Sequence, residues 1–177
     1  DAIDFAATIG QRHPLDLSRL VLLGHSAGGH LALWSAGRHR VHPASPLARP
    51  AGVAAAGVVS MAGIADLETY IDVGNDCSRS VEPLMGGRPA EFADRYHAGN
   101  PTRLLPTGIS TRLIHGEGDA IVPLEQPQGY MRAAVAAGDD CQIKVLPIDG
   151  HFEVVAPGSA AFAAVLSAIG EIISPRR

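Results

Sequence analysis

RLVLLGHSAGG, residues 19–29, decides the fold, because it joins a buried strand to a helix through glycines placed around one serine. RLVLL (Arg19–Leu23) is a short apolar run typical of a strand buried on both faces. It continues directly into a G-x-S-x-G motif centred on Ser26, and the helix-like stretch Gly28–Arg38 follows. This strand–turn–helix arrangement lifts a serine hydroxyl above the end of a parallel sheet. Ser26 is therefore the candidate nucleophile.

The glycines of the motif, Gly24 and Gly28, are expected from the sharpness of the turn, and a third glycine, Gly29, follows them. A serine at such an apex takes a strained backbone conformation, and side chains at the flanking positions would collide with the neighbouring strand and helix. The N–H of Ala27, at the start of the helix, would donate to an oxyanion that develops on a bound carbonyl.

Three further segments have the composition of buried strands, and helix-like stretches lie between or after them. The strand segments are Gly52–Ser60, Thr111–His115 and Gln142–Pro147, and the helical ones are Leu124–Ala137 and Ser159–Ile173. Strands that alternate with helices predict a mostly parallel sheet with helices on both faces. Such a sheet carries its chemistry just past the carboxyl ends of the strands. A length of 177 residues predicts one domain.

Residues 66–107 interrupt this alternation, because they are rich in proline and glycine and have no strong period. Short helices are expected at Asp66–Ile71 and Ala90–Tyr96. A long connection in a compact domain is usually functional, so we predict a lid-like or substrate-binding insert. Its larger apolar side chains would either line an acyl or aryl pocket or hold a small lid together; they are Tyr70, Met85, Phe92 and Tyr96.

A serine hydroxyl needs a general base, and the chain has eight histidines. Only His151 lies just past the end of the last predicted strand, in a Gly-His turn. His25 is the variable residue before Ser26, and alternation along the strand would point it away from the serine. Four more histidines are placed on a packing helix, in a polar loop or in the insert; they are His30, His39, His42 and His97.

The base must be oriented by a carboxylate, and two candidates follow the strand Thr111–His115. Asp119 precedes an apolar segment and is the better candidate, while Glu117 is expected to be a solvated loop acid. The chain order is then Ser26, Asp119 and His151, which differs from the orders found in chymotrypsin and subtilisin.

With these residues in place, the chain resembles the α/β-hydrolase fold superfamily over essentially its whole length. The resemblance rests on GHSAGGHLA (24–32), HGEGDAIVP (115–123) and GHFE (150–153). The first of these is similar to the esterase or carboxylesterase-like branch and to the arylformamidase-like branch. The resemblance implies a serine hydrolase that cleaves a small-molecule carboxylic ester, or an activated amide, through an acyl-enzyme. Peptidases of the prolyl-oligopeptidase type more often carry a bulky residue where this chain has Ala27.

The resemblance also implies that residues 1–177 are a partial α/β-hydrolase domain that lacks the amino-terminal strands. The chain opens at Asp1 inside a helix-like pattern, with no initiator methionine, no signal-peptide pattern and no H-G-G-type loop before Gly24. We therefore expect a weakly active fragment of a longer hydrolase, and a cytoplasmic location is favoured. Without upstream partners, RLVLL would be an apolar edge strand that could support a homodimer.

Two other functions stay open on the sequence. An arylformamidase or aminopeptidase-like enzyme would use the same machinery on an amide, and a non-catalytic scaffold would use only the fold. No cofactor or metal is expected, because Asp72, Asp76 and Glu82 lack ligand spacing and a histidine partner.

The overall composition limits the partners of the chain. A net charge of −4 without a run of Lys or Arg argues against nucleic acid. The longest uncharged stretch, Pro50–Ala65, is too short to cross a membrane. Cys77 and Cys141 are expected to be free thiols, and a disulfide between them would require export from the cell.

Overall fold

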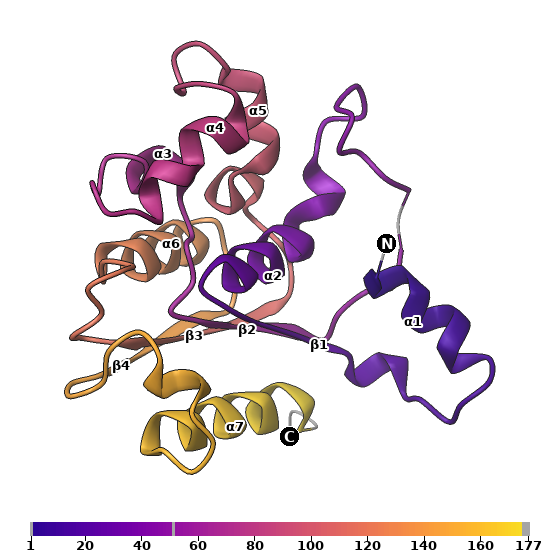
Figure 1. Ribbon diagram of the computed structural model, residues 1–177. Coiled ribbons are helices and arrows are strands. Elements are labelled where there is room, and N and C mark those ends of the chain that lie inside the picture. Colours follow the sequence, from indigo (N-terminus) through magenta and orange to yellow (C-terminus); the bar gives the residue numbers. More distant parts are fainter. Residues whose placement is uncertain (1, 51, 175–177) are drawn as a thin grey trace.

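Four parallel strands form the centre of the protein in a computed structural model, which describes residues 2–50 and 52–174 (Figure 1). They lie in the order β1 (Val21–His25), β2 (Gly57–Met61), β3 (Ser110–Gly116) and β4 (Cys141–Leu146). The four strand segments predicted from the sequence are these four strands, and every neighbouring pair runs parallel. The predicted α/β fold class is confirmed.

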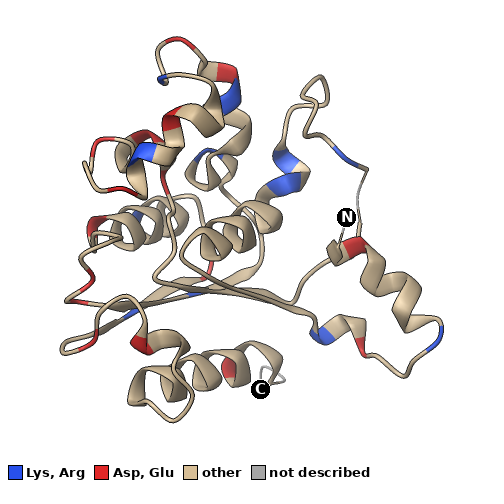
Figure 2. Cartoon of the chain, viewed as in Figure 1, with Lys and Arg blue, Asp and Glu red and all other residues tan. Residues whose placement is uncertain are grey.

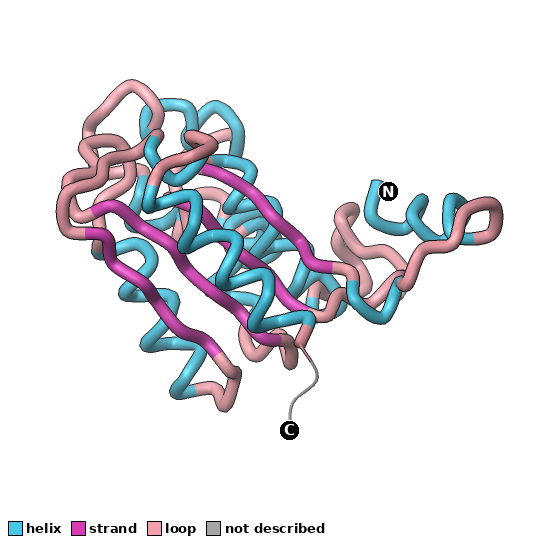
Figure 3. The backbone as a smooth tube through the Cα atoms, turned by 90° about the horizontal axis from the view of Figure 1, so that it is seen from below, coloured by secondary structure: helices cyan, strands magenta, loops and turns pink. Residues whose placement is uncertain are grey.

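Helices cover both faces of this sheet, as Figures 1 and 3 show. On one face lie α2 (Ala27–Gly37) and α6 (Glu125–Ala136), and on the other lies α7 (Ala160–Ile173). The helix α1 (Ala2–Gly10) stands to the side of β1 and buries none of its residues.

The apolar core has one layer on each side of the sheet, because neighbouring residues of a strand point to opposite faces. Val59 and Ile114 pack with Val165 of α7, whereas Val58 and Leu113 pack on the side of α2 and α6. The two layers hold the strands in one register and so hold their carboxyl ends at one edge.

Two strands have different bounds from those predicted. β1 begins two residues later, because Leu17–Arg19 forms a 3₁₀ turn in which the side chain of Asp16 accepts a hydrogen bond from the N–H of Ser18. β2 begins only at Gly57, which pairs with Val21 and Ser110, the first residues of its neighbours. The described residues just before Gly57 form no strand, although the N–H of Ala56 donates to the carbonyl of Leu20 at 2.7 Å.

The outer strands also differ from the prediction that every strand is buried on both faces. β4 alternates between buried and exposed residues, with Gln142 and Lys144 facing solvent. β1 lies at the other edge of the sheet, and among the described residues its outer side pairs with no strand. This agrees with the expected edge strand, while a homodimer through it stays a prediction.

Residues 66–107 form several short helices that lie above α2 and α6 in Figure 1. They are α3 (Leu67–Tyr70), the 3₁₀ turn Ser78–Ser80, α4 (Val81–Met85), α5 (Ala93–Gly99) and the 3₁₀ turn Pro101–Leu104. The two short helices predicted here correspond to α3 and α5, whereas α4 was missed because Pro83 lies inside it. Further 3₁₀ turns occur at Arg38–Arg40 and Glu153–Val155.

The insert has its own apolar core, which includes Tyr70, Met85 and Tyr96 and reaches Val122 in the loop after β3. These three side chains are buried in one cluster and hold the insert together, which is the second of the two roles expected for them. Both positively and negatively charged residues occur along the helices and loops of the insert (Figure 2). Both cysteines are free thiols, as expected, with Cys77 exposed and Cys141 buried. No helix in the described ranges is long and apolar enough to cross a membrane.

Candidate active site

Ser26 occupies the sharp turn between β1 and α2. Its backbone has φ 54° and ψ −119°. Residues with a side chain rarely adopt such a positive φ. The Ser26 N–H donates to the carbonyl of Met61 at the end of β2, at 2.9 Å. The strained serine is thus fixed to the neighbouring strand, as the motif predicts.

The glycines around Ser26 have unequal roles. A Cβ on Gly24 would lie 2.0 Å from the carbonyl oxygen of Gly28, and one on Gly29 would lie 2.7 Å from the Cα of Gly63. A Cβ on Gly28 would meet nothing within 4 Å. The expectation of a collision is therefore correct for Gly24 and wrong for Gly28, because the Cβ direction at Gly28 points to open space. The third glycine, Gly29, is the one packed against β2.

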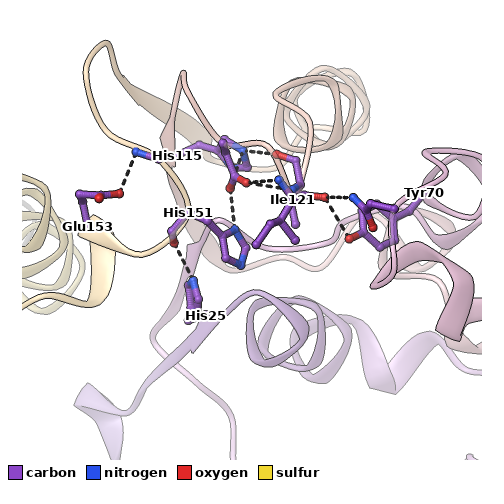
Figure 4. Close-up of polar contacts among 10 residues, drawn as sticks. His25, Tyr70, His115, Ile121, His151 and Glu153 are labelled. Atoms are coloured by element: carbon purple, nitrogen blue, oxygen red, sulfur yellow. Dashed lines mark hydrogen bonds and ion pairs between the residues drawn. The ribbon is translucent and has the colours of Figure 1, made fainter.

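Asp119 and His151 lie in contact, although 32 positions separate them in the chain (Figure 4). His151 Nδ1 is 2.7 Å from Asp119 Oδ2, and the two side chains are 5% and 1% exposed. The other carboxylate oxygen, Oδ1, accepts the backbone N–H groups of Ile121 at 2.8 Å and Val122 at 2.9 Å. Both oxygens of this buried carboxylate are therefore satisfied, which is what its burial requires. Glu117 has an exposed side chain, as expected of a loop acid.

The loops that carry Asp119 and His151 touch because Gly116 ends β3 without a side chain. A Cβ there would lie 2.3 Å from the carbonyl oxygen of Asp149 and 2.4 Å from that of Gly150. In addition, the N–H of Gly118 donates to the Asp149 carbonyl at 3.0 Å.

His25, which the sequence predicts to point away from Ser26, also belongs to the site. Its Nε2 donates to the carbonyl of His151 at 2.8 Å, and the two ring centroids are 4.6 Å apart. Phe152 completes the group, with its ring edge-on to that of His151 at 5.0 Å. The residue before Ser26 thus contacts the histidine loop directly. This contact could not be predicted from the motif, because the two residues lie 126 positions apart in the sequence.

His115, in β3, contacts the loop that carries Asp119 (residues 117–124), which we call the acid loop. Its side chain is buried, and its Nε2 lies 2.8 Å from the carbonyl of Val122 and 3.5 Å from Asp119 Oδ2. Burial is the main cause that lowers the pKa of His115, so the ring is neutral and donates from Nε2 to the Val122 carbonyl. Its Nδ1 is buried without a hydrogen-bond partner.

Ser26 lies at the end of the strand whose last residue, His25, contacts the His151 loop. Among the described residues, the observed hydrogen bonds of Ser26 are those of its backbone, so a hydrogen bond from its hydroxyl to His151 stays a prediction. Ala27 is the first residue of α2, where N–H groups have no partner within the helix. The described part of the chain contains no cluster of three metal-ligating side chains.

Comparison with known proteins gives a match to one family model and a shared fold with several solved structures. The model of the BD-FAE family matches residues 1–133, a range that includes Ser26 and Asp119 and ends before His151. No curated protein matches the chain in sequence.

Several solved structures share the fold at low sequence identity. A truncated carbohydrate esterase from gut microbiota superposes with a TM-score of 0.78 at 20% identity, covering 98% of this chain and 66% of the other. The Pyrococcus horikoshii acylaminoacyl peptidase has a TM-score of 0.75 at 17% identity, covering 97% and 27%. The Thermogutta terrifontis esterase Est2 has a TM-score of 0.69 at 19% identity, covering 99% and 65%. The chain therefore spans between about a quarter and two thirds of the length of these structures.

Proposed function

Because the chain belongs to the BD-FAE family, an α/β-hydrolase-type family, we propose that it takes part in hydrolysis of a carboxylic ester through Ser26. The observation that carries this proposal is the buried hydrogen bond between Asp119 and His151, at 2.7 Å, in a chain that also holds a serine in a strained turn after β1. A buried carboxylate on Nδ1 fixes the imidazole in the tautomer whose Nε2 can accept a proton.

In the proposed reaction, the Ser26 hydroxyl attacks the carbonyl carbon of the ester while His151 Nε2 takes its proton. Asp119 stabilises the imidazolium that forms, and the Ala27 N–H donates to the negative oxygen of the tetrahedral intermediate. His151 then returns the proton to the leaving alcohol, which leaves an acyl group on Ser26. Water, activated by His151, releases the acid and restores the serine.

Hydrolysis of an amide is the second candidate, because the fold also occurs in an acylaminoacyl peptidase and one fold can serve either reaction. The same residues would act, but His151 would protonate a leaving amine instead of an alcohol. At 17% identity the likeness shows only a common fold, so the ester remains the first choice.

The experiment compares hydrolysis of short p-nitrophenyl esters, N-formyl aromatic amides and dipeptides by the natural full-length protein and its Ser26→Ala variant. We expect the esters to be cleaved fastest and Ser26→Ala to abolish cleavage of every substrate that turns over. Ser167→Ala, on the exposed face of α7, is the matched control and should keep full activity. Ester cleavage that survives Ser26→Ala would refute the proposal, and faster cleavage of the amides would favour the second candidate.

A further inference from the structure

Two side chains of the insert converge on one carbonyl in the acid loop (Figure 4). The hydroxyl of Tyr70 donates to the Ile121 carbonyl at 3.1 Å, and the amide Nδ2 of Asn75 donates to the same oxygen at 2.7 Å. Both donors come from residues 66–107, whereas Ile121 belongs to the loop that follows β3. Both lone pairs of the Ile121 carbonyl oxygen therefore accept a hydrogen bond.

The peptide group that receives these bonds also contacts the proposed catalytic acid. The carbonyl of Ile121 and the N–H of Val122 belong to a single planar peptide unit. That N–H donates to Asp119 Oδ1 at 2.9 Å, and the neighbouring Ile121 N–H donates to the same oxygen at 2.8 Å. Hydrogen bonds in such a chain polarise one another, so donors on the carbonyl strengthen the N–H that faces the carboxylate.

Both donors are fixed in their roles. The Tyr70 ring is fully buried, and burial, followed by the nearby Cys77 and Asp119, raises the pKa of its hydroxyl. The hydroxyl therefore keeps its proton and remains a donor. Asn75 is oriented by its own turn, because its Oδ1 accepts the N–H of Ser78 at 2.8 Å, which directs Nδ2 to Ile121.

We propose that Tyr70 and Asn75 are positioning residues of the reaction, which fix the Ile121–Val122 peptide and through it aim the Asp119 carboxylate at His151. This inference rests on the proposed function of the triad. The insert would then influence catalysis. A change in Tyr70 or Asn75 would alter the Ile121–Val122 peptide and, through it, the Asp119 carboxylate that orients His151. Neither residue touches the substrate in this role.

The test measures kcat, KM and thermal stability for Tyr70→Phe, Asn75→Ala and the double variant, on an ester that the natural full-length protein cleaves. One neutral hydrogen bond is worth about fivefold in an equilibrium or a rate, and a positioning contact passes on part of this, so we expect about threefold lower kcat for each variant and about tenfold for the double. KM should stay constant, because the substrate loses no contact. A matched control is Tyr96→Phe, since the Tyr96 hydroxyl is equally buried in the insert and donates to the Gly87 carbonyl, away from the acid loop.

The control separates positioning from stability. Tyr96→Phe should lower the melting temperature as much as Tyr70→Phe and leave kcat unchanged. Unchanged kcat in both single variants, or an equal loss of kcat in Tyr96→Phe, would overturn the inference. If the double variant does not fold, Tyr70→Phe alone decides, because it keeps the ring and removes only the hydroxyl.

Failure of the proposed function would look different. In that case the unmodified protein would show no cleavage dependent on Ser26, and the insert variants would be compared by a readout that needs no substrate. A second readout is the proton on His151 Nδ1 in a nuclear magnetic resonance spectrum. It should broaden or shift in Tyr70→Phe and keep its position in Tyr96→Phe.

Discussion

Ser26 holds a backbone conformation that costs about 1–3 kcal/mol for a residue with a side chain, and its neighbours compensate this cost. The Ser26 N–H bonds to the Met61 carbonyl, and the N–H of His30 bonds back to the Ser26 carbonyl at 3.1 Å. Ala62, at the end of β2, has a similar positive φ of 45° and is completely buried. Strain is thus concentrated at two adjacent strand ends, where the proposed nucleophile lies.

The unequal environments of the motif glycines lead to a paired prediction. Gly24→Ala places a methyl group 2.0 Å from the backbone oxygen of Gly28, which cannot move without opening the turn, so we expect loss of several kcal/mol or failure to fold. Gly28→Ala places its methyl group in open space and within a helix, where alanine is favoured over glycine by about 1 kcal/mol.

Thermal unfolding followed by circular dichroism measures both variants against the unmodified protein. The expected order of melting temperature is Gly28→Ala at or above the unmodified protein, and Gly24→Ala far below it. Equal destabilisation by both changes would contradict the geometry described for the turn.

At the scale of elements, the insert is joined to the sheet layers by a few specific contacts. Trp34 of α2 donates from its indole nitrogen to the carbonyl of Ala98 in α5, at 2.8 Å. Gly37 allows α2 to approach Leu104, because a Cβ there would lie 2.6 Å from that side chain. These contacts fix the insert against α2.

Trp34→Phe removes the bond between α2 and α5 and leaves the Ala98 carbonyl without a partner. We expect the free energy of unfolding to fall by about 1–2 kcal/mol, a typical value for an unsatisfied buried acceptor. Activity on esters should be unchanged, because Trp34 has no contact with the acid loop. Urea denaturation and ester kinetics test the two halves of this prediction, and a large fall in kcat at constant stability would contradict it.

Sequence patterns predict the elements of this site better than they predict the contacts between them. The sequence places Ser26, Asp119 and His151 each after a predicted strand, and in the structure each of them follows a strand at the same edge of the sheet. His25 and Asn75 were not found, since their partners lie 126 and 46 positions away and depend on how the loops pack. The strand bounds were missed at residues 19–20 and 52–56 for a related reason, because pairing partners decide where a strand begins.

At the scale of the whole molecule, buried histidines make stability depend on pH. Burial is the largest cause that lowers the pKa of both His30 and His115 below the ordinary value of 6.5. Below about pH 6.5 the unfolded chain binds protons that the folded protein does not, so folding stability is complete above this pH and falls as the pH decreases. Each histidine contributes at most about 1.4 kcal/mol per pH unit.

Urea denaturation between pH 7.5 and 5.5 measures this effect in a window above the ordinary titration range of carboxylates. We expect the free energy of unfolding to decrease towards pH 5.5, and the decrease to be smaller in His30→Gln. His13→Gln, at an exposed histidine, should leave the slope unchanged. A free energy of unfolding that is constant over this range would show that the buried rings accept protons without cost.

The most direct test of the central claim, that Ser26 is a nucleophile activated by the Asp119–His151 pair, is covalent labelling with a fluorophosphonate. The natural full-length protein and its His151→Ala variant are treated with the probe, and the modified residue is located by mass spectrometry. We predict one adduct, on Ser26, that forms in the unmodified protein and is lost or strongly slowed in His151→Ala. No adduct on Ser26, or one that forms equally fast without the histidine, would contradict this account.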